Sequence, residues 1–216
     1  ITAIAKPRGI PVLVDAAAEE LRVPNVHLAR GASLVAYSGG KCLRGPQCAG
    51  LLLGQADLVR AAWVHSAPHH GFGRALKVGR EEIVGMLTAV EEWGRRDHAA
   101  EQREWLSWLN TIASRLADVP GVTTAIVPVD PNALSNRSPS LTVSWDRTRI
   151  PLTGDEAALA LYHGSPRIAV SGAGSYLPFP PSETPEISLV PYQMAAGEER
   201  VVADRLRAFF LNPPRT

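Results

Sequence analysis

A lysine behind two glycines, Lys41 in "YSGGKCLRGPQCAGLLLG" (37–54), stands where an amine is able to do chemistry. A carboxylate, Asp15, ends a second short apolar run, "GIPVLVD" (9–15). The run that ends at Asp15 and the run before Lys41, "ASLVAYSGG" (32–40), both have the length and apolar composition of buried strands. Ligands of parallel sheets gather at the carboxyl ends of the strands. We therefore expect Asp15 and Lys41 to reach one crevice.

A phosphate-binding loop is excluded as the role of Lys41. Such a loop needs a glycine six residues before its lysine and a serine or threonine directly after it. This sequence has Val35 and Cys42 at those two positions. The strings "GFGRAL" and "GAGSYL" lack the third glycine of a dinucleotide-binding turn, and neither GxSxG nor HExxH occurs.

The pair of Lys41 and Asp15 matches the two demands of pyridoxal phosphate (PLP) chemistry. A desolvated lysine has a lowered pKa and becomes a nucleophile towards aldehydes. A carboxylate that faces the pyridine nitrogen keeps that nitrogen protonated. From spacing alone, a surface lysine and an aspartate that caps a helix are the simpler interpretation.

Composition indicates an ordinary globular chain. Its 216 residues allow one or two domains, with 45% apolar and 20% charged residues and a net charge of +1. That charge points neither to nucleic acid nor to disorder. No apolar run has the length of a membrane span. Cys42 and Cys48 fit neither a disulfide framework nor a zinc motif, so we expect no metal and a cytoplasmic setting.

The order of elements predicts an α/β part followed, after the Pro-Gly at 120–121, by a small α+β domain. The first part has expected strands at 9–15, 32–40 and 49–54, a turn of helix at 16–22 and a helix at 55–65, in a sheet covered on both faces. Residues 80–119 form an amphipathic helical stretch that Gly94 is expected to divide. The last part has expected strands at 122–129, 140–145, 167–172 and 186–194, helices at 154–164 and 197–211, and a proline-rich loop at 176–185.

Three ordered motifs carry a resemblance to a known family: "PVLVDAAAEE", "YSGGKCLRGPQCAGLLLG" and "GRALKVGREEIVGMLTAVE". Together they resemble the fold-type I PLP-dependent enzymes of the bacterial selenocysteine synthase group, which includes L-seryl-tRNA(Sec) selenium transferase and D-glucosaminate-6-phosphate ammonia-lyase-like proteins. The resemblance also covers "GSPRIAV" and "GEERVVADRLRAFF". It implies an aspartate aminotransferase-like α/β fold. Residues 1–90 would be the carboxyl-terminal part of the PLP-binding large domain, and 91–216 the connecting helix and small α+β domain.

The resemblance also implies roles for the residues around the cofactor. Lys41 would be the Schiff-base lysine and the general acid/base at the substrate α-carbon. Asp15 would keep the ring nitrogen protonated, and Ala17 would lie near the ring face. Ser38 and the amides of Gly39 and Gly40 would lie near the phosphate, although a plain tight turn is the simpler interpretation of that string.

Three cationic residues are implied to bind substrate. Arg74 and Lys77 would face an anionic group and would share one face if their segment is helical; the alternative is a solvated charge cluster. Arg167 would fork a substrate carboxylate from the small domain.

The function implied is α,β-elimination on an amino acid or amino-sugar acid by a homodimer or higher homo-oligomer. The glycine pair before Lys41 resembles the ammonia-lyase-like branch. The alternatives are an L-seryl-tRNA(Sec) selenium transferase, for which tRNA would be a partner, and a truncated non-catalytic homologue. Because the chain begins at Ile1, we expect it to start inside a domain whose upstream half supplies a phosphate-cradling turn and the residue stacked on the ring.

Overall fold

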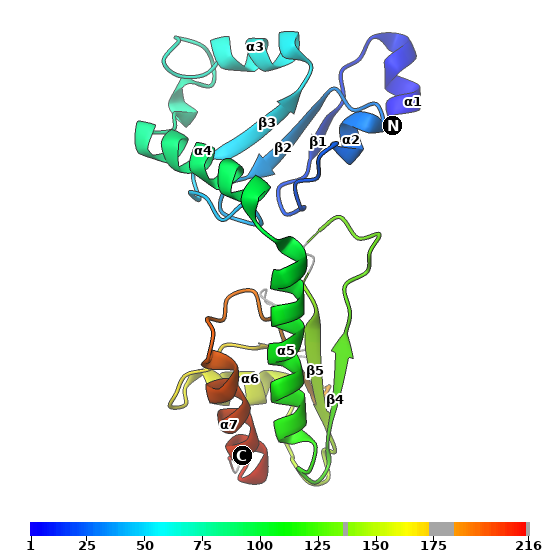
Figure 1. The fold of residues 1–216 in the computed structure, drawn as a ribbon, viewed down its shortest axis with the longest axis vertical. Helices are drawn as coiled ribbons and strands as arrows, with labels where there is room; N and C mark the ends of the chain where they lie inside the picture. Colours follow the sequence, from blue (N-terminus) through cyan, green and yellow to red (C-terminus); the bar gives the residue numbers. More distant parts are fainter. Residues whose placement is uncertain (136–137, 173–183, 215–216) are drawn as a thin grey trace. The chain divides into compact units, whose positions relative to one another are not determined.

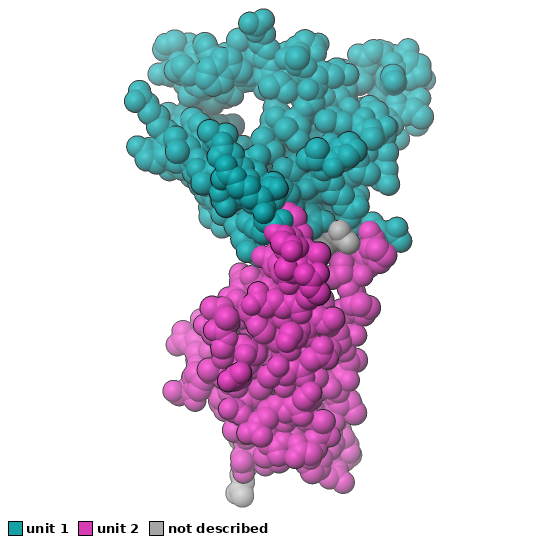
Figure 2. Space-filling view, viewed as in Figure 1, with its two compact units in different colours: residues 1–96, 132–137 teal, residues 97–131, 138–216 magenta. Residues whose placement is uncertain are grey.

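A computed structural model describes residues 1–135, 138–172 and 184–214 of the chain (Figure 1). These residues form two compact units, which Figure 2 colours separately. Unit 1 comprises Ile1–Arg96 and the short segment that begins at Asn132. Unit 2 comprises Asp97–Pro131 and the described residues from Ser138 onwards. Most of the expected proline-rich loop at 176–185 lies outside the described residues.

Unit 1 is built on a three-stranded sheet with the strand order β1-β2-β3. Its strands are β1 (Leu13–Asp15), β2 (Leu34–Ser38) and β3 (Gly50–Gly54). Strands β1 and β2 are parallel, as expected, whereas β2 and β3 are antiparallel. The physical reason lies in the connection at 39–49, which consists of turns and is too short for the helical crossover that parallel neighbours need.

Short helices and one long helix surround this sheet. They are α1 (Thr2–Ala5), η1 (Lys6–Arg8), α2 (Val26–Ala29), α3 (Ala56–Val64), η2 (Arg74–Leu76) and α4 (Arg80–Arg95). The turn of helix expected at 16–22 is wrong, because those residues form turns and extended chain. The carboxylate of Asp15 accepts a hydrogen bond from the Ala17 N–H, and such an Asx turn competes with helix formation.

The two faces of the unit 1 sheet differ. Val35 and Tyr37 alternate onto one face, where they join a buried cluster with Leu43 and with Met86 of α4. Leu13 and Asp15 lie on the opposite face. Leu13 is 60% exposed, so the expectation of strands covered on both faces is wrong for β1. In the described chain β1 is an edge strand, with β2 on one side only.

Unit 2 is a four-stranded antiparallel sheet with the order β4-β5-β7-β6 and helices packed on one face. Its elements are α5 (His98–Leu116), β4 (Val122–Val127), β5 (Ser140–Trp145), α6 (Gly154–Tyr162), β6 (Ser171–Gly172), β7 (Glu186–Leu189) and α7 (Glu198–Leu211). In β5 Leu141, Val143 and Trp145 are buried, while the serines and threonine between them are half-buried. That alternation is what a sheet covered by helices on one face requires, and it confirms the predicted α+β arrangement.

The helical stretch at 80–119 is divided, but not at Gly94. Helix α4 runs through Gly94 to Arg95, and α5 begins at His98. The side chain of Asp97 accepts a hydrogen bond from the Ala100 N–H at 2.9 Å, which caps the second helix. The capping residue therefore sets the boundary. Within the described ranges, no helix has both the length and the hydropathy needed to cross a membrane.

Candidate functional site

The turn after β1 and the loop after β2 are joined at the carboxyl ends of these parallel strands. Asp15 pairs with Ala36 in the register, and the Ala16 N–H donates to the Ala36 carbonyl at 2.9 Å. The Ser38 N–H donates to the Ala17 carbonyl at 3.3 Å. Further along, the Cys42 thiol donates to the Ala18 carbonyl at 3.3 Å. The segments that carry Asp15 and Lys41 are therefore neighbours.

The carboxylate of Asp15 is exposed and held by its own turn. Its Oδ1 accepts from the Ala17 N–H at 3.0 Å. The Ala17 carbonyl in turn accepts from β2, so this residue connects the Asp15 side chain to the neighbouring strand. An oriented carboxylate beside a residue with a small side chain suits a flat, cationic ring group.

Lys41 lies in a compact loop closed by backbone hydrogen bonds. The Gly39 N–H donates to the Ala49 carbonyl at 2.9 Å, and the Gly45 N–H donates to the Gly39 carbonyl at 2.7 Å. A Cβ on Gly39 would lie 2.6 Å from the Pro46 carbonyl oxygen and 2.7 Å from that of Ala49. Only glycine fits there. Lys41 itself is exposed in this chain, whereas PLP chemistry led us to expect a desolvated amine.

The hydrogen bonds inside this loop reduce the number of groups that could donate to a phosphate. The Gly39 N–H already has an acceptor, so it is not available as a donor to phosphate. The Gly40 carbonyl accepts from the Gln47 side chain at 3.1 Å. The Ser38 hydroxyl and the Gly40 N–H stay as the predicted donors.

The three predicted substrate cations are all exposed, but they are not brought together by a shared helix. Arg74 begins η2, a 3-10 helix of one turn, and Lys77 follows it with an extended backbone. The condition for a shared helical face, a helical segment that contains both residues, is therefore not met. The Arg74 guanidinium donates to the Pro68 carbonyl. Arg167 belongs to unit 2, where its Cζ lies 4.7 Å from the centre of the Tyr162 ring.

A partly buried polar cluster beside the site was missed from sequence. The ring Nε2 of His27 lies 2.6 Å from Oε2 of Glu19, and the Asn25 amide donates to the Tyr37 hydroxyl at 2.7 Å. Burial raises the pKa of Tyr37, with a smaller contribution from the charge of Glu19 and an opposing one from the Asn25 hydrogen bond. The only sequence signal was Asn25 ahead of "VHLA", a helix N-cap pattern.

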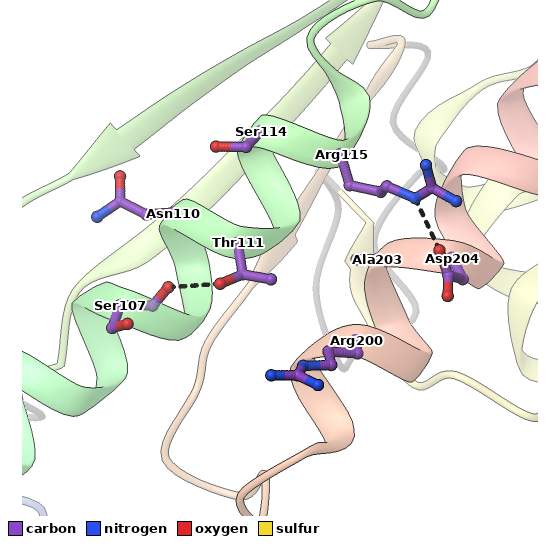
Figure 3. A pocket seen from close by; sticks show the side chains of 8 residues that line it. All are labelled: Ser107, Asn110, Thr111, Ser114, Arg115, Arg200, Ala203 and Asp204. Carbon is purple, nitrogen blue, oxygen red and sulfur yellow. Dashed lines mark hydrogen bonds and ion pairs between the residues drawn. The ribbon is translucent and has the colours of Figure 1, made fainter.

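Unit 2 has an open polar groove between α5 and α7 (Figure 3). Its hydroxyl and amide groups include Thr111 and Asn110, which donate back to carbonyls of their own helix. An ion pair joins Arg115 to Asp204 at 2.7 Å across the groove. None of the residues predicted to do chemistry lines this groove.

Comparison with solved structures accounts for nearly the whole chain. The structure of D-glucosaminate-6-phosphate ammonia-lyase matches 97% of this chain with a TM-score of 0.73 and 25% sequence identity. SPT with PLP matches 96% of the chain at a TM-score of 0.52 and 17% identity, which shows a common fold. The chain has the fold of fold-type I PLP-dependent enzymes. It spans 51% of the length of the ammonia-lyase structure.

Comparison with the sequences of known enzymes agrees with this fold assignment. It is 39% identical over 123 residues to a 5'-C-glycyluridine monooxygenase-decarboxylase from a Streptomyces species, and 32% identical over 120 residues to the D-glucosaminate-6-phosphate ammonia lyase of Salmonella typhimurium. These alignments cover 56% and 55% of the chain, but only 29% and 30% of the relatives. The L-seryl-tRNA(Sec) selenium transferase of Edwardsiella ictaluri is 27% identical over 128 residues, covering 54% of the chain and 26% of that enzyme. No model of a known protein family matches the chain. The resemblance found from sequence is confirmed.

Proposed function

We propose that the protein is a PLP-dependent enzyme that catalyses α,β-elimination on an amino acid or amino-sugar acid. One observation carries the proposal: the parallel pairing of β1 and β2 makes the Asp15 turn and the Lys41 loop neighbours. When bound, PLP supplies an electron sink for negative charge at the substrate α-carbon. The similarity to D-glucosaminate-6-phosphate ammonia lyase supports elimination as the reaction.

The groups on this edge of the sheet fit the cofactor. A carboxylate whose Oδ1 is held by the Ala17 N–H suits a protonated ring nitrogen. The backbone cradle around Gly39 has no room for a Cβ, so it holds the start of the Lys41 loop in place. The Ser38 hydroxyl and the Gly40 amide suit the phosphate oxygens.

Each residue then has a definite task in our proposal. Lys41 holds the cofactor through its Nζ and moves a proton at the substrate α-carbon. Asp15 keeps a proton on the ring nitrogen, and Ala17 leaves space beside the ring. Arg74, Lys77 and Arg167 bind anionic groups of the substrate.

We also propose the domain assignment and assembly that the resemblance implies. We assign residues 1–90 to the carboxyl-terminal part of a PLP-binding large domain, and 91–216 to the connecting helix and small domain. We also propose a homodimer or higher homo-oligomer. Fully exposed Phe72 and the 82% exposed Leu76 are candidate residues for the interface between subunits. A cytoplasmic location remains our prediction from cysteine usage.

A second reaction deserves a direct test because of the Streptomyces relative. That protein is named a monooxygenase-decarboxylase and shares 39% identity with this chain. The competing proposal is therefore loss of the α-carboxylate rather than of the α-proton and a β-substituent. The two reactions differ in their products: elimination followed by hydrolysis releases ammonia, whereas decarboxylation releases carbon dioxide.

The first experiment is an absorbance titration of the full-length protein with PLP. We expect a band near the visible edge that is absent in Lys41→Ala and unchanged in Lys6→Ala, a matched exposed lysine. Borohydride reduction should leave the cofactor on the peptide that contains Lys41. Turnover of candidate amino-sugar acids is measured as the release of ammonia and of carbon dioxide. This turnover should fall by about three orders of magnitude or more in Lys41→Ala. A wild-type protein with no band would refute the proposal.

A further inference from the structure

A closed ring of contacts joins the two segments that carry Asp15 and Lys41. On one side of this ring, Ser38 of β2 donates its N–H to Ala17 in the Asp15 turn. On the other side the path runs from Glu19 through His27 and helix α2 to Asn25, and from there to Tyr37 of β2. The turn and the strand are therefore connected both through the backbone and through side chains.

Glu19 closes the turn that begins at Asp15. Its N–H donates to the Ala16 carbonyl at 2.9 Å, and its carboxylate contacts the His27 ring at 2.6 Å. The Glu19 and His27 side chains are only 20% and 14% exposed, so water screens this contact less than it screens a surface pair. Between Asp15 and Glu19 lies the Ala17 amide that orients the Asp15 carboxylate.

Asn25 and helix α2, at the other end of this path of contacts, are held in place by separate hydrogen bonds. Asn25 caps α2, since its Oδ1 accepts from the His27 and Leu28 N–H groups at 3.1 Å. Its amide nitrogen donates to the hydroxyl of Tyr37, whose side chain is in the unit 1 core. Helix α2 therefore presents His27 from a fixed position relative to β2.

Residues 133–135 hold the same turn from another direction. The Glu20 N–H donates to the Leu134 carbonyl at 3.0 Å, and the Arg22 guanidinium donates to the Ala133 carbonyl at 2.9 Å. Glu19 also forms an isolated β-bridge with Ser135. These contacts fix the backbone beyond Glu19, whereas the contact with His27 is the one made by the Glu19 side chain.

We propose that Glu19 and His27 are positioning residues that hold the Asp15 turn in register with the Lys41 loop. The proposal rests on the proposed function, because its benefit is the orientation of Asp15 towards the cofactor ring. Loss of the Glu19 carboxylate frees one side of the turn. The Ala17 N–H then leaves the Asp15 Oδ1 more often, and the carboxylate spends less time in the geometry that the ring nitrogen requires.

The test compares Glu19→Ala and Glu19→Gln with Glu92→Ala in the full-length protein. Glu92 is a matched control, because its carboxylate contacts Arg95 at 2.7 Å on the exposed surface of α4. In Glu19→Ala we expect the Kd for PLP to rise about tenfold. We also expect the pH midpoint of the visible band to move by about half a unit or more. Glu19→Gln keeps a hydrogen-bonding group for His27 and should recover most of the affinity. Glu92→Ala should behave as the wild type.

Amide hydrogen exchange without added PLP is the second measurement, and it does not depend on the cofactor. In Glu19→Ala the Ala17 and Glu19 amides should exchange about tenfold faster, while those of Val35 and Tyr37 in β2 stay unchanged. Unchanged exchange at Ala17 would overturn the proposal, even if the band moves, since Glu19 would then act through its charge alone. A wild type that forms no band would refute the proposed function, and exchange at Ala17 alone would then decide the role of Glu19.

Discussion

The two units divide packing and chemistry between them. In unit 2 a single cluster of nineteen buried residues joins α5, α6 and α7 to the sheet, whereas the corresponding cluster of unit 1 has eight, counted over the described residues. The acid and the amine proposed for catalysis are both in unit 1, on turns at the end of a small sheet, and both are exposed. Substitutions in the core of unit 2 should therefore act on stability, and substitutions in the unit 1 turns should act on the cofactor site. Arg167 is the residue of unit 2 that we propose to bind substrate.

The largest effect on stability is expected from the centre of the unit 2 core. Leu206 of α7 is fully buried, so Leu206→Ala should lower the free energy of unfolding by about 2–5 kcal/mol through lost burial and a cavity. Thermal unfolding followed by tryptophan fluorescence measures this. The PLP absorbance band should be unchanged at temperatures where the variant is folded.

The matched control is Leu159→Ala on α6, where the side chain is 60% exposed. This variant should stay within about 0.5 kcal/mol of the wild type. Equal losses in the free energy of unfolding for Leu206→Ala and Leu159→Ala would contradict the conclusion that the buried core stabilises unit 2. A disturbed PLP band in folded Leu206→Ala would break the separation of packing from chemistry.

A smaller loss of stability, but a larger loss of cofactor binding, is expected at Gly39. A Cβ there would press on the Pro46 and Ala49 carbonyl oxygens and on the Met86 sulfur, all within 2.7 Å. Gly39→Ala should cost about 1–3 kcal/mol through overpacking, and it should displace the Lys41 loop enough to weaken the PLP band. Denaturant unfolding and PLP titration measure the two effects.

Gly94→Ala is the matched control for Gly39→Ala. Gly94 is inside α4, and a Cβ there would meet nothing within 4 Å. This variant should gain about 0.5–1 kcal/mol, because alanine is the better helix former. If Gly39→Ala were equally harmless, the glycine before Lys41 would have no packing role and the loop would be less constrained than its contacts imply.

Sequence patterns predicted some elements better than others, for a physical reason. The alternating apolar residues of β5 report its buried face directly, and the prediction at 140–145 matches the observed bounds. Of the strand expected at 167–172 only Ser171–Gly172 is formed, and the strand expected at 186–194 ends at Leu189. In unit 1 the antiparallel direction of β3 and the exposure of Leu13 could not be predicted, because neither property changes the pattern of apolar residues in the sequence. The turn at 16–22 was missed because a single side-chain hydrogen bond at Asp15 decides it.

The candidate site shows the same limit. Strand ends and residue types were enough to predict that Asp15 ends one strand and that Lys41 follows a neighbouring parallel strand. Sequence could not reveal that the Gly39 amide is already bonded to Ala49, since backbone pairing across a loop leaves no residue signature. The contact between Glu19 and His27 depends on where α2 lies relative to the turn, and that arrangement is set by tertiary packing.

The smallest effect is expected from a surface pair that joins the turn after α5 to α7 in unit 2. The Arg207 guanidinium forms a two-pronged contact with the Asp118 carboxylate, and its hydrogen bond holds the pKa of Asp118 below the ordinary value. Because the folded state favours the ionised form, this pair stabilises unit 2 above the ordinary carboxyl pKa and loses that contribution as the pH falls through the lowered one. Asp118→Asn should therefore be slightly less stable than the wild type at neutral pH, and the difference should vanish in acid.

Thermal midpoints of wild type, Asp118→Asn, Arg207→Gln and the double variant, measured from neutral to acidic pH, test this pair. Both single variants remove the Arg207–Asp118 contact, so the loss in the double variant should be smaller than the sum of the two single losses. Arg207→Gln also removes the hydrogen bond to the Arg115 carbonyl, so it should cost more than Asp118→Asn. A loss that does not depend on pH would mean that Asp118 acts by packing rather than by charge. Because the pair lies in unit 2, the PLP band should stay the same in all four proteins, and any change in it would show that α7 influences the chemistry in unit 1.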